Sequence, residues 1–260
     1  MSQKPTLKTT AFRRSALRRA PPTADYGHPV SNPLQTGQVE AAGPGPDVVL
    51  FDLGGVLMNF GGLGRLAKLS GEKQDPALHT RWISAPWVQA FERGACTTEE
   101  FAQGVVNDLE LDLTPAAFLD DFSQWSAGPF VGSLELVRSL HGTVAMGCLS
   151  NTNSVHWQRH LNHWGIVQYF DWTFTSHELG MMKPDPAVFR HVIRTIGTTP
   201  DRLLFLDDVN ENVQAARASG MRSEQTVGVH EVEDALRSHL SADSVSGRAL
   251  RTSATHRPAT

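Results

Sequence analysis

The sequence predicts an α/β fold, in which a parallel β-sheet is covered by helices on both faces and a helical segment is inserted after the first strand. Short, nearly continuous apolar runs alternate with helical patterns, as expected of parallel strands that are buried on both faces. One long interval, residues 61–128, interrupts this alternation and contains several helical patterns but no convincing strand. Together these two observations predict one α/β core and a separate helical part.

Five segments have the composition of strands, and four of them are strongly apolar. In chain order they are DVVLFDL (47–53), TVAMGCLS (143–150), WTFTS (172–176), RLLFLDD (202–208) and SEQTVGV (223–229). Helical patterns lie between them, at residues 133–140, 154–163, 186–196 and 210–219. This order predicts a Rossmann-like, three-layer core with a parallel sheet, formed by residues 47–60 and 129–240.

Residues 61–128 are expected to form a helical cap subdomain inserted into that core. Their helical patterns are LGRLAKL, RWISAPWVQAFERG, TTEEFAQGVVNDLEL and PAAFLDDFSQW. Thr97, followed three positions later by Glu100, predicts a capping box before an apolar run. The small core of the cap is expected to contain Trp82, Trp87, Phe91 and Phe101. An exposed ion pair is the expected role of Glu92 and Arg93, with a position facing the substrate as the alternative.

Composition sets limits on partners and compartment. The chain has 260 residues, of which 40% are hydrophobic and 19% charged, enough for one large domain or two small ones. A formal net charge of −4 gives no overall attraction to nucleic acids or anionic membranes, and no apolar run approaches the roughly 18 residues of a membrane span. Neither kind of partner is expected, and the chain should act as a monomer or homodimer. Cys96 and Cys148 lack metal-type spacing and favour a reducing compartment, so a cytoplasmic location is expected.

Both ends of the chain are expected to be disordered. Residues 1–20 hold six basic residues and no acid, and residues 21–46 are rich in Pro, Gly and small polar residues. Residues 241–260 form another polar tail. The basic start is interpreted as a solvated tail or a misassigned start codon. An organellar transit peptide is the main alternative, and an arm that touches nucleic acid is a weaker one.

Reactive side chains stand at or just beyond the carboxyl ends of the predicted strands, where parallel α/β sheets bind their ligands. They are Asp52, Ser150, Asn151, Lys183, Asp207 and Asp208, and Asn212 follows four residues after Asp208. Each of them alone is more often a helix cap or a turn residue. Together, carboxylates, a hydroxyl and a lysine around one crevice can hold a divalent cation and a phosphate, and can offer an anionic nucleophile.

The wording of these segments resembles the four motifs of the haloacid dehalogenase-like (HAD) hydrolases. The matching segments, in order, are FDLGGVL, LSNTN, GMMKPDPAVF and FLDDVNENVQAARASGM, and the resemblance covers about residues 47–230. The segment AFERGACTTEEF resembles the helical cap that follows the first motif in the dehalogenase and phosphatase branch of the family. Within that branch the sequence is similar to phosphatases of the α-D-glucose-1-phosphate phosphatase type, which carry comparable DLG and LSNTN motifs.

The resemblance implies a metal site and a nucleophile. Asp52 would attack phosphorus, form an aspartyl-phosphate, and bind Mg²⁺ together with the backbone carbonyl of Gly54. Asp208 would be the metal-binding acid, because Asn212 matches the supporting position behind it. Asp207 would then support the metal site, although the two aspartates could exchange roles.

The resemblance also implies a phosphate site. Ser150 and Asn151 would bind the transferring phosphoryl oxygens, Ser150 through its hydroxyl and backbone donors. Lys183 would neutralise charge between the nucleophile and the phosphate, an electrostatic role that is central to phosphoryl transfer. Asp52, Ser150 and Lys183 are therefore the expected catalytic residues, and Mg²⁺ is the expected cofactor.

Gly54 departs from the family pattern, because most of the family's phosphatases have a second aspartate there that acts as general acid and then base. Such catalysis typically supplies about 10²–10⁴-fold. Three interpretations follow. The leaving group could need little protonation, as in an anomeric sugar phosphate or an acyl phosphate. Another group, from the cap or near His177 and Glu178, could substitute. Or the protein could be a slow or inactive relative.

The expected function is that of a Mg²⁺-dependent phosphatase acting on a small phosphorylated metabolite, with a sugar phosphate favoured. A haloacid dehalogenase-type hydrolase is the first alternative, but it would use no metal and leave Asp207 and Asp208 without a purpose. A non-catalytic interaction protein with the HAD fold is the second. His156, His160 and His163 recur at helical spacing without an accompanying acid, so they are expected to be packed or solvated rather than to bind metal.

Overall fold

A computed structural model describes residues 45–71 and 76–240 of the chain. The two expected tails therefore lie outside the described residues, apart from the short segment 45–46. Within the described part, no helix is both long and apolar enough to cross a membrane. The strands are β1 (Val48–Phe51), β2 (Met58–Phe60), β3 (Ser126–Pro129), β4 (Ala145–Ser150), β5 (Trp172–Thr175), β6 (Leu203–Asp207) and β7 (Arg222–Gln225).

The described helices fall into a cap group and a core group. The first group is α1 (Gly62–Ser70), α2 (Pro76–Ser84), α3 (Pro86–Glu92), α4 (Thr98–Asp108) and α5 (Pro115–Phe122). The second is α6 (Ser133–Leu140), α7 (Ser154–Arg159), α8 (Ser176–Leu179), α9 (Pro186–Ile196), α10 (Asn210–Ala218) and α11 (Gly228–His239). Short helical turns are η1 (His160–Trp164), η2 (Ile166–Tyr169) and η3 (Pro200–Arg202).

A five-stranded parallel sheet forms the centre of the core, in the order β5-β4-β1-β6-β7. Strand β1 lies in the middle, and all four of its residues are buried, as a strand covered on both faces requires. Because β4 and β6 flank β1 in parallel, the carboxyl ends of these three strands meet at one edge of the sheet. This confirms the predicted α/β fold class.

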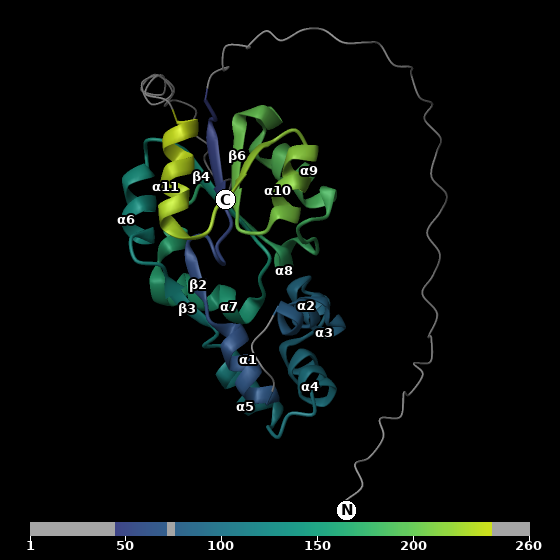
Figure 1. The fold of residues 1–260 in the computed structure, drawn as a ribbon. Coiled ribbons are helices and arrows are strands. Elements are labelled where there is room, and N and C mark those ends of the chain that lie inside the picture. Colours follow the sequence, from purple (N-terminus) through teal and green to yellow (C-terminus); the bar gives the residue numbers. More distant parts are fainter. Residues whose placement is uncertain (1–44, 72–75, 241–260) are drawn as a thin grey trace, which may run out of the picture. The chain divides into compact units, whose positions relative to one another are not determined.

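Alternate residues of each strand enter two different cores, one on each face of the sheet. On one face, Val49 and Phe51 pack with residues of α6 and α11, among them Val137 and Val232. On the other face, Leu50 packs with residues of α9 and α10, which are Val188, Phe189, Val192 and Ala216. Figure 1 shows α6 and α11 on one side of the sheet and α9 and α10 on the other, which gives the three layers.

Three details differ from the sequence prediction. The interval 61–128 contains one short strand after all, because β3 pairs antiparallel with β2. The strand predicted at 223–229 is shorter, since β7 ends at Gln225 and α11, which was not predicted, begins at Gly228. The helix predicted at 154–163 is α-helical only to Arg159 and continues as the π-helical turn η1.

The helices α1 to α5 pack around an aromatic cluster of their own. The buried members include Trp82, Phe91, Phe101, Phe118, Phe122 and Trp125, whereas Trp87 is only partly buried. The rings of Phe91 and Phe101 stack with centroids 4.2 Å apart, and those of Trp82 and Trp125 are 5.0 Å apart. At the start of α4, Thr97 and Glu100 form the predicted capping box.

Candidate active site

The ends of β1, β4 and β6 bring the predicted site residues together. Asp52 directly follows β1, Ser150 is the last residue of β4, and Asp207 is the last residue of β6. Each of the three is at least nine-tenths buried. Lys183 reaches the same place from the loop between α8 and α9, and its side chain is buried.

Lys183 lies between two carboxylates. Its Nζ is 2.9 Å from Asp52 Oδ1, and it donates a hydrogen bond of 2.6 Å to Asp207 Oδ2. Burial alone would lower the pKa of Lys183, but the negative charges of Asp207 and Asp52 outweigh it and raise that pKa above its ordinary value. The lysine is therefore a fixed positive charge next to the carboxylate of Asp52.

Asp52 has one oxygen engaged and one available. Oδ1 accepts a 2.7 Å hydrogen bond from Leu53 N and faces Lys183. Among the described residues, Oδ2 has no hydrogen-bond partner. Burial raises the pKa of Asp52 to about 7 against the lowering effect of Lys183, and the charges of Asp207 and Asp208 add to the rise. The site thus holds more negative charge than one lysine compensates.

Asp207 is held more firmly than Asp208. The side chain of Asn212 donates to both carboxylate oxygens of Asp207, at 3.0 and 3.1 Å, and Val209 N donates to Oδ1 at 2.8 Å. The sequence predicts that Asn212 supports Asp208, but in the structure Asn212 supports Asp207, because it lies in the turn of α10 that faces the buried aspartate. Asp208 is only partly buried, and burial together with the charge of Asp207 raises its pKa to about 6.

Three carboxylates fit a divalent cation. Asp52, Asp207 and Asp208 each offer an oxygen, and these oxygens lie within 4.8 Å of one another. Such hard, anionic oxygens are the ligands that Mg²⁺ prefers. Burial and the neighbouring aspartates raise the pKa values of Asp52 and Asp208, and a bound cation would oppose this rise by favouring the ionised forms. The residues present therefore suit the expected cofactor, while the ligand roles of Asp52, Gly54, Asp207 and Asp208 stay predictions.

The two glycines after Leu53 differ in their surroundings. Gly55 has a φ of +77°, and a Cβ there would lie 2.1 Å from Asp208 Oδ2, so no other residue fits without moving that carboxylate. A Cβ on Gly54 would have no atom within 4 Å, and Gly54 lines the cavity described below. The absence of an aspartate at Gly54 is therefore not forced by lack of space.

Asn151 serves Lys183 in this structure. Its side-chain amide donates to Lys183 O and accepts from Lys183 N, each at 2.9 Å, so it fixes the backbone of the lysine. The predicted contact of Asn151 with phosphate stays a prediction. Because the side-chain amide of Asn151 is already bonded to the backbone of Lys183, such a contact would have to use the Asn151 backbone. Ser150 lies on the cavity wall, and its hydroxyl has no hydrogen-bond partner within the described ranges.

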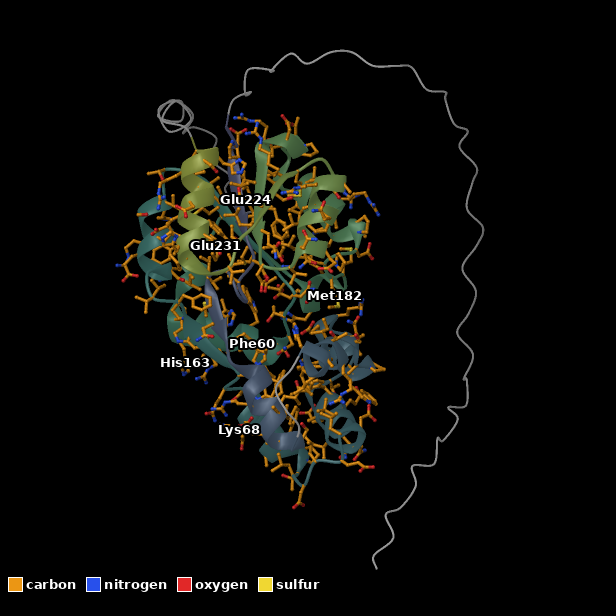
Figure 2. All side chains as sticks on the ribbon, viewed as in Figure 1. Phe60, Lys68, His163, Met182, Glu224 and Glu231 are labelled. Atoms are coloured by element: carbon orange, nitrogen blue, oxygen red, sulfur yellow. The ribbon has the colours of Figure 1, made fainter. Side chains whose placement is uncertain are left out.

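A cavity of about 380 Å³ opens over the strand ends. Its polar end contains Gly54, Ser150, Asn151 and Asp208. The rest of the wall combines apolar and polar side chains from the cap and from the core. The apolar ones are Met58, Phe60, Trp82, Ile83, Val88, Phe91, Phe101, Phe122, Phe130 and Val209, and the polar ones are Asn59, His79, Glu92, Ser126, Thr152, Asn153, His156 and His160. Phe60, labelled in Figure 2, stands at the end of β2 where the chain leads into α1. Water-excluding walls of this kind strengthen electrostatic interactions at the polar end.

Two histidines on the wall are packed, as expected. His156 Nε2 donates to Phe122 O at 2.8 Å, and its Nδ1 accepts from Asn153 at 3.2 Å. His160 Nε2 lies 2.9 Å from the hydroxyl of Ser126. Burial lowers the pKa of both imidazoles to about 4, so both are neutral at pH 7. His163, labelled in Figure 2, is exposed.

Glu92 was expected to form an exposed ion pair with Arg93, and that expectation was wrong. Arg93 donates instead to Gln89, while Glu92 is partly buried and lines the cavity. The sequence offered a signal for this position, because Glu92 directly follows the apolar residue Phe91 at the end of α3 and precedes a glycine turn.

Residues 46–220 match a family model described as haloacid dehalogenase-like hydrolase. The chain belongs to this family. Its matches among known proteins include the bifunctional epoxide hydrolase 2 of Mus musculus, which is 37% identical over 28% of this chain. The match spans only 12% of the length of that epoxide hydrolase. The sesquiterpene phosphatase astK of Aspergillus oryzae is 30% identical over 70% of this chain and 87% of its own length. The fructose-1-phosphate phosphatase YqaB of Escherichia coli is 27% identical over 48% of this chain and 69% of its own.

Solved structures of the HAD family have the same fold. A HAD family enzyme from Bacteroides thetaiotaomicron, in complex with magnesium and inorganic phosphate, superimposes with a TM-score of 0.59. It is 24% identical, and the match covers 70% of this chain and 94% of that one. This likeness supports the fold of a hydrolase core with an inserted cap.

Proposed function

We propose that this HAD hydrolase is a Mg²⁺-dependent phosphatase that hydrolyses a small phosphorylated metabolite through an aspartyl-phosphate on Asp52. The observation that carries the proposal is the arrangement of Lys183 between Asp52 and Asp207 at the edge of the sheet, with Asp208 close by. Three carboxylates and one lysine leave an excess of negative charge, which a divalent cation would balance.

In the proposed reaction, an oxygen of Asp52 forms a bond to phosphorus while the ester bond between phosphorus and the leaving oxygen breaks. Lys183, held by Asn151, keeps Asp52 oriented and offsets the negative charge of the phosphoryl group. The hydroxyl of Ser150 is available to donate to a phosphoryl oxygen. Water then attacks the aspartyl-phosphate, which releases inorganic phosphate and restores the carboxylate. Mg²⁺, held by Asp52 and Asp208, would supply further neutralisation of the phosphate charge.

Two substrate classes have support. The resemblance to glucose-1-phosphate phosphatases and the similarity to a fructose-1-phosphate phosphatase favour a sugar phosphate. The cavity wall and the similarity to a sesquiterpene phosphatase favour a phosphate ester with a largely apolar organic group. A sugar hydroxyl facing the aromatic wall without a partner would cost about 1–3 kcal/mol. We therefore propose the apolar class first and the sugar phosphates second.

The acidic cluster also bears on the other two functions that the sequence left open. A dehalogenase mechanism does not need three carboxylates that can hold a cation. A non-catalytic protein does not need a buried lysine between two of these carboxylates. Both alternatives remain outcomes of the experiment below.

The test is phosphate release by the purified full chain, with Mg²⁺ and with EDTA, from decyl phosphate, glucose 1-phosphate and fructose 1-phosphate. We expect Mg²⁺-dependent release, with the highest kcat/KM for decyl phosphate. Highest activity on a sugar phosphate would reverse the order of the substrate classes. No release from any ester would contradict the proposal, and chloride release from 2-chloropropionate would then identify a dehalogenase.

A further inference from the structure

The proposed reaction needs a proton donor that the first motif does not supply. When the ester bond breaks, an alcohol leaves well only if its oxygen receives a proton, and such catalysis is worth about 10²–10⁴-fold. Gly54 has no side chain to provide it, although the space around it is open. A proton donor therefore has to come from another part of the cavity wall.

Among the residues that the structure describes, five titratable side chains line the cavity: His79, Glu92, His156, His160 and Asp208. The imidazoles of His156 and His160 are neutral at pH 7, and each has its Nε2 engaged by Phe122 O or Ser126. Asp208 belongs to the acidic cluster, where a bound cation would hold it ionised. His79 and Glu92 are left, and of these His79 is exposed whereas Glu92 is partly buried.

The position of Glu92 is fixed from both sides. It is the last residue of α3, next to the buried Phe91. The turn after it packs closely on the core, because a Cβ on Gly94 would lie 2.2 Å from His177 O at the start of α8. Helices α3 and α8 are in contact, and α8 leads to the loop that carries Lys183. The carboxyl of Glu92 therefore shares one cavity with the strand ends while belonging to the cap.

The carboxyl of Glu92 is also uncommitted. Within the described part of the chain it has no hydrogen-bond or ion-pair partner. Burial raises the pKa of Glu92 to about 7, although the charges of Arg93 and Lys183 lower it. His177 and Glu178 are the titratable groups of α8, the core helix that contacts α3. A carboxyl that is close to half protonated near neutral pH can serve first as acid and then as base.

We propose that Glu92 is the general acid–base of this phosphatase, supplied by the cap in place of the aspartate that Gly54 lacks. As the phosphorus–oxygen ester bond breaks, the Glu92 carboxyl transfers its proton to the leaving alkoxide oxygen, which departs as the alcohol. In the second step the Glu92 carboxylate takes a proton from the water that attacks the aspartyl-phosphate, and Glu92 returns to its acid form. This inference rests on the proposed function.

The leaving group tests the inference. Decyl phosphate releases an alkoxide that needs a proton, whereas p-nitrophenyl phosphate releases a stable phenolate that does not. We compare kcat/KM, because it reports only the steps up to release of the alcohol or phenolate and leaves out the hydrolysis of the aspartyl-phosphate that both esters share. We expect Glu92→Gln to lower kcat/KM for decyl phosphate by about 10²–10⁴-fold. The loss of kcat/KM for p-nitrophenyl phosphate should be smaller by a factor of at least about ten. The matched control is Glu99→Gln, an exposed glutamate in the first turn of α4, which should match the wild type on both esters.

Two further readouts separate proton transfer from a structural role. In the wild type, kcat/KM for decyl phosphate should fall as pH rises through about 7, because Glu92 loses its proton, and Glu92→Gln should lose this dependence. Adding Gly54→Asp to the Glu92→Gln variant should restore part of the lost rate on decyl phosphate, since the new carboxyl has room. An equal loss of kcat/KM on both esters, or no loss on either, would overturn the inference while Mg²⁺-dependent release by the wild type would still support the proposed function. No release by the wild type would contradict both.

Discussion

The contrast between Gly54 and Gly55 gives a sharp test of the metal site. Gly55→Ala would place a Cβ 2.1 Å from Asp208 Oδ2, closer than the 3.0 Å below which something must shift. The carboxylate would have to retreat, and the left-handed φ of +77° would add about 1–2 kcal/mol of backbone strain. Gly54→Ala has no neighbour within 4 Å and no such strain, so it is the matched control.

Displacing a carboxylate from a cation site weakens binding. We expect the Mg²⁺ concentration for half-maximal phosphatase activity to rise about 10–100-fold in Gly55→Ala, the effect typical of losing a group that orients a metal ligand. In Gly54→Ala it should change by no more than about twofold. The assay is p-nitrophenyl phosphate hydrolysis across a Mg²⁺ series, with circular dichroism to verify that both variants are folded. Equal Mg²⁺ requirements in two folded variants would refute the assignment of Asp208 to the metal site.

Two other predictions concern the supports of the site. Asn151→Ala removes both hydrogen bonds to the Lys183 backbone, each worth about 0.5–1.5 kcal/mol, so urea unfolding should show a loss of about 1–3 kcal/mol and kcat should fall; unchanged stability and kcat would contradict the clamp. His160 has a pKa lowered from 6.5 to about 4, so the unfolded chain binds its proton first as pH falls, and the wild type should lose about 2 kcal/mol relative to His160→Gln between pH 7 and pH 5; a constant difference in unfolding free energy would contradict this.

The residues at the strand ends could be predicted because apolar strands are easy to recognise in the sequence. In a parallel sheet the carboxyl ends of neighbouring strands lie at the same edge, which brings these residues together. Asp52, Ser150 and Asp207 follow or end strands that are neighbours in the sheet, so their proximity follows from topology. Lys183 lies on a loop, and its place between two aspartates is visible only in three dimensions.

Strand β3 and the burial of Glu92 differ from the sequence prediction because they depend on tertiary contacts. Strand β3 has the sequence SAGP, which has little strand propensity, and it is extended because it pairs with β2. Helix α11 did carry a signal, since Val232, Ala235 and Leu236 recur at helical spacing, but the preceding valines suggested a longer strand. The apolar Phe91 before Glu92 and the glycine turn after it are only a weak sequence signal, because the packing of that turn on α8 decides how far Glu92 is buried.

The most direct test of the central claim is to look for phosphate on Asp52. The wild type and Asp52→Asn would each be mixed with excess p-nitrophenyl phosphate and Mg²⁺, quenched in acid within the first turnovers, and mapped by peptide mass spectrometry. We predict a phosphorylated peptide containing Asp52 in the wild type, and neither this peptide nor measurable phosphate release in a folded Asp52→Asn variant. Sustained phosphate release by Asp52→Asn would contradict the account.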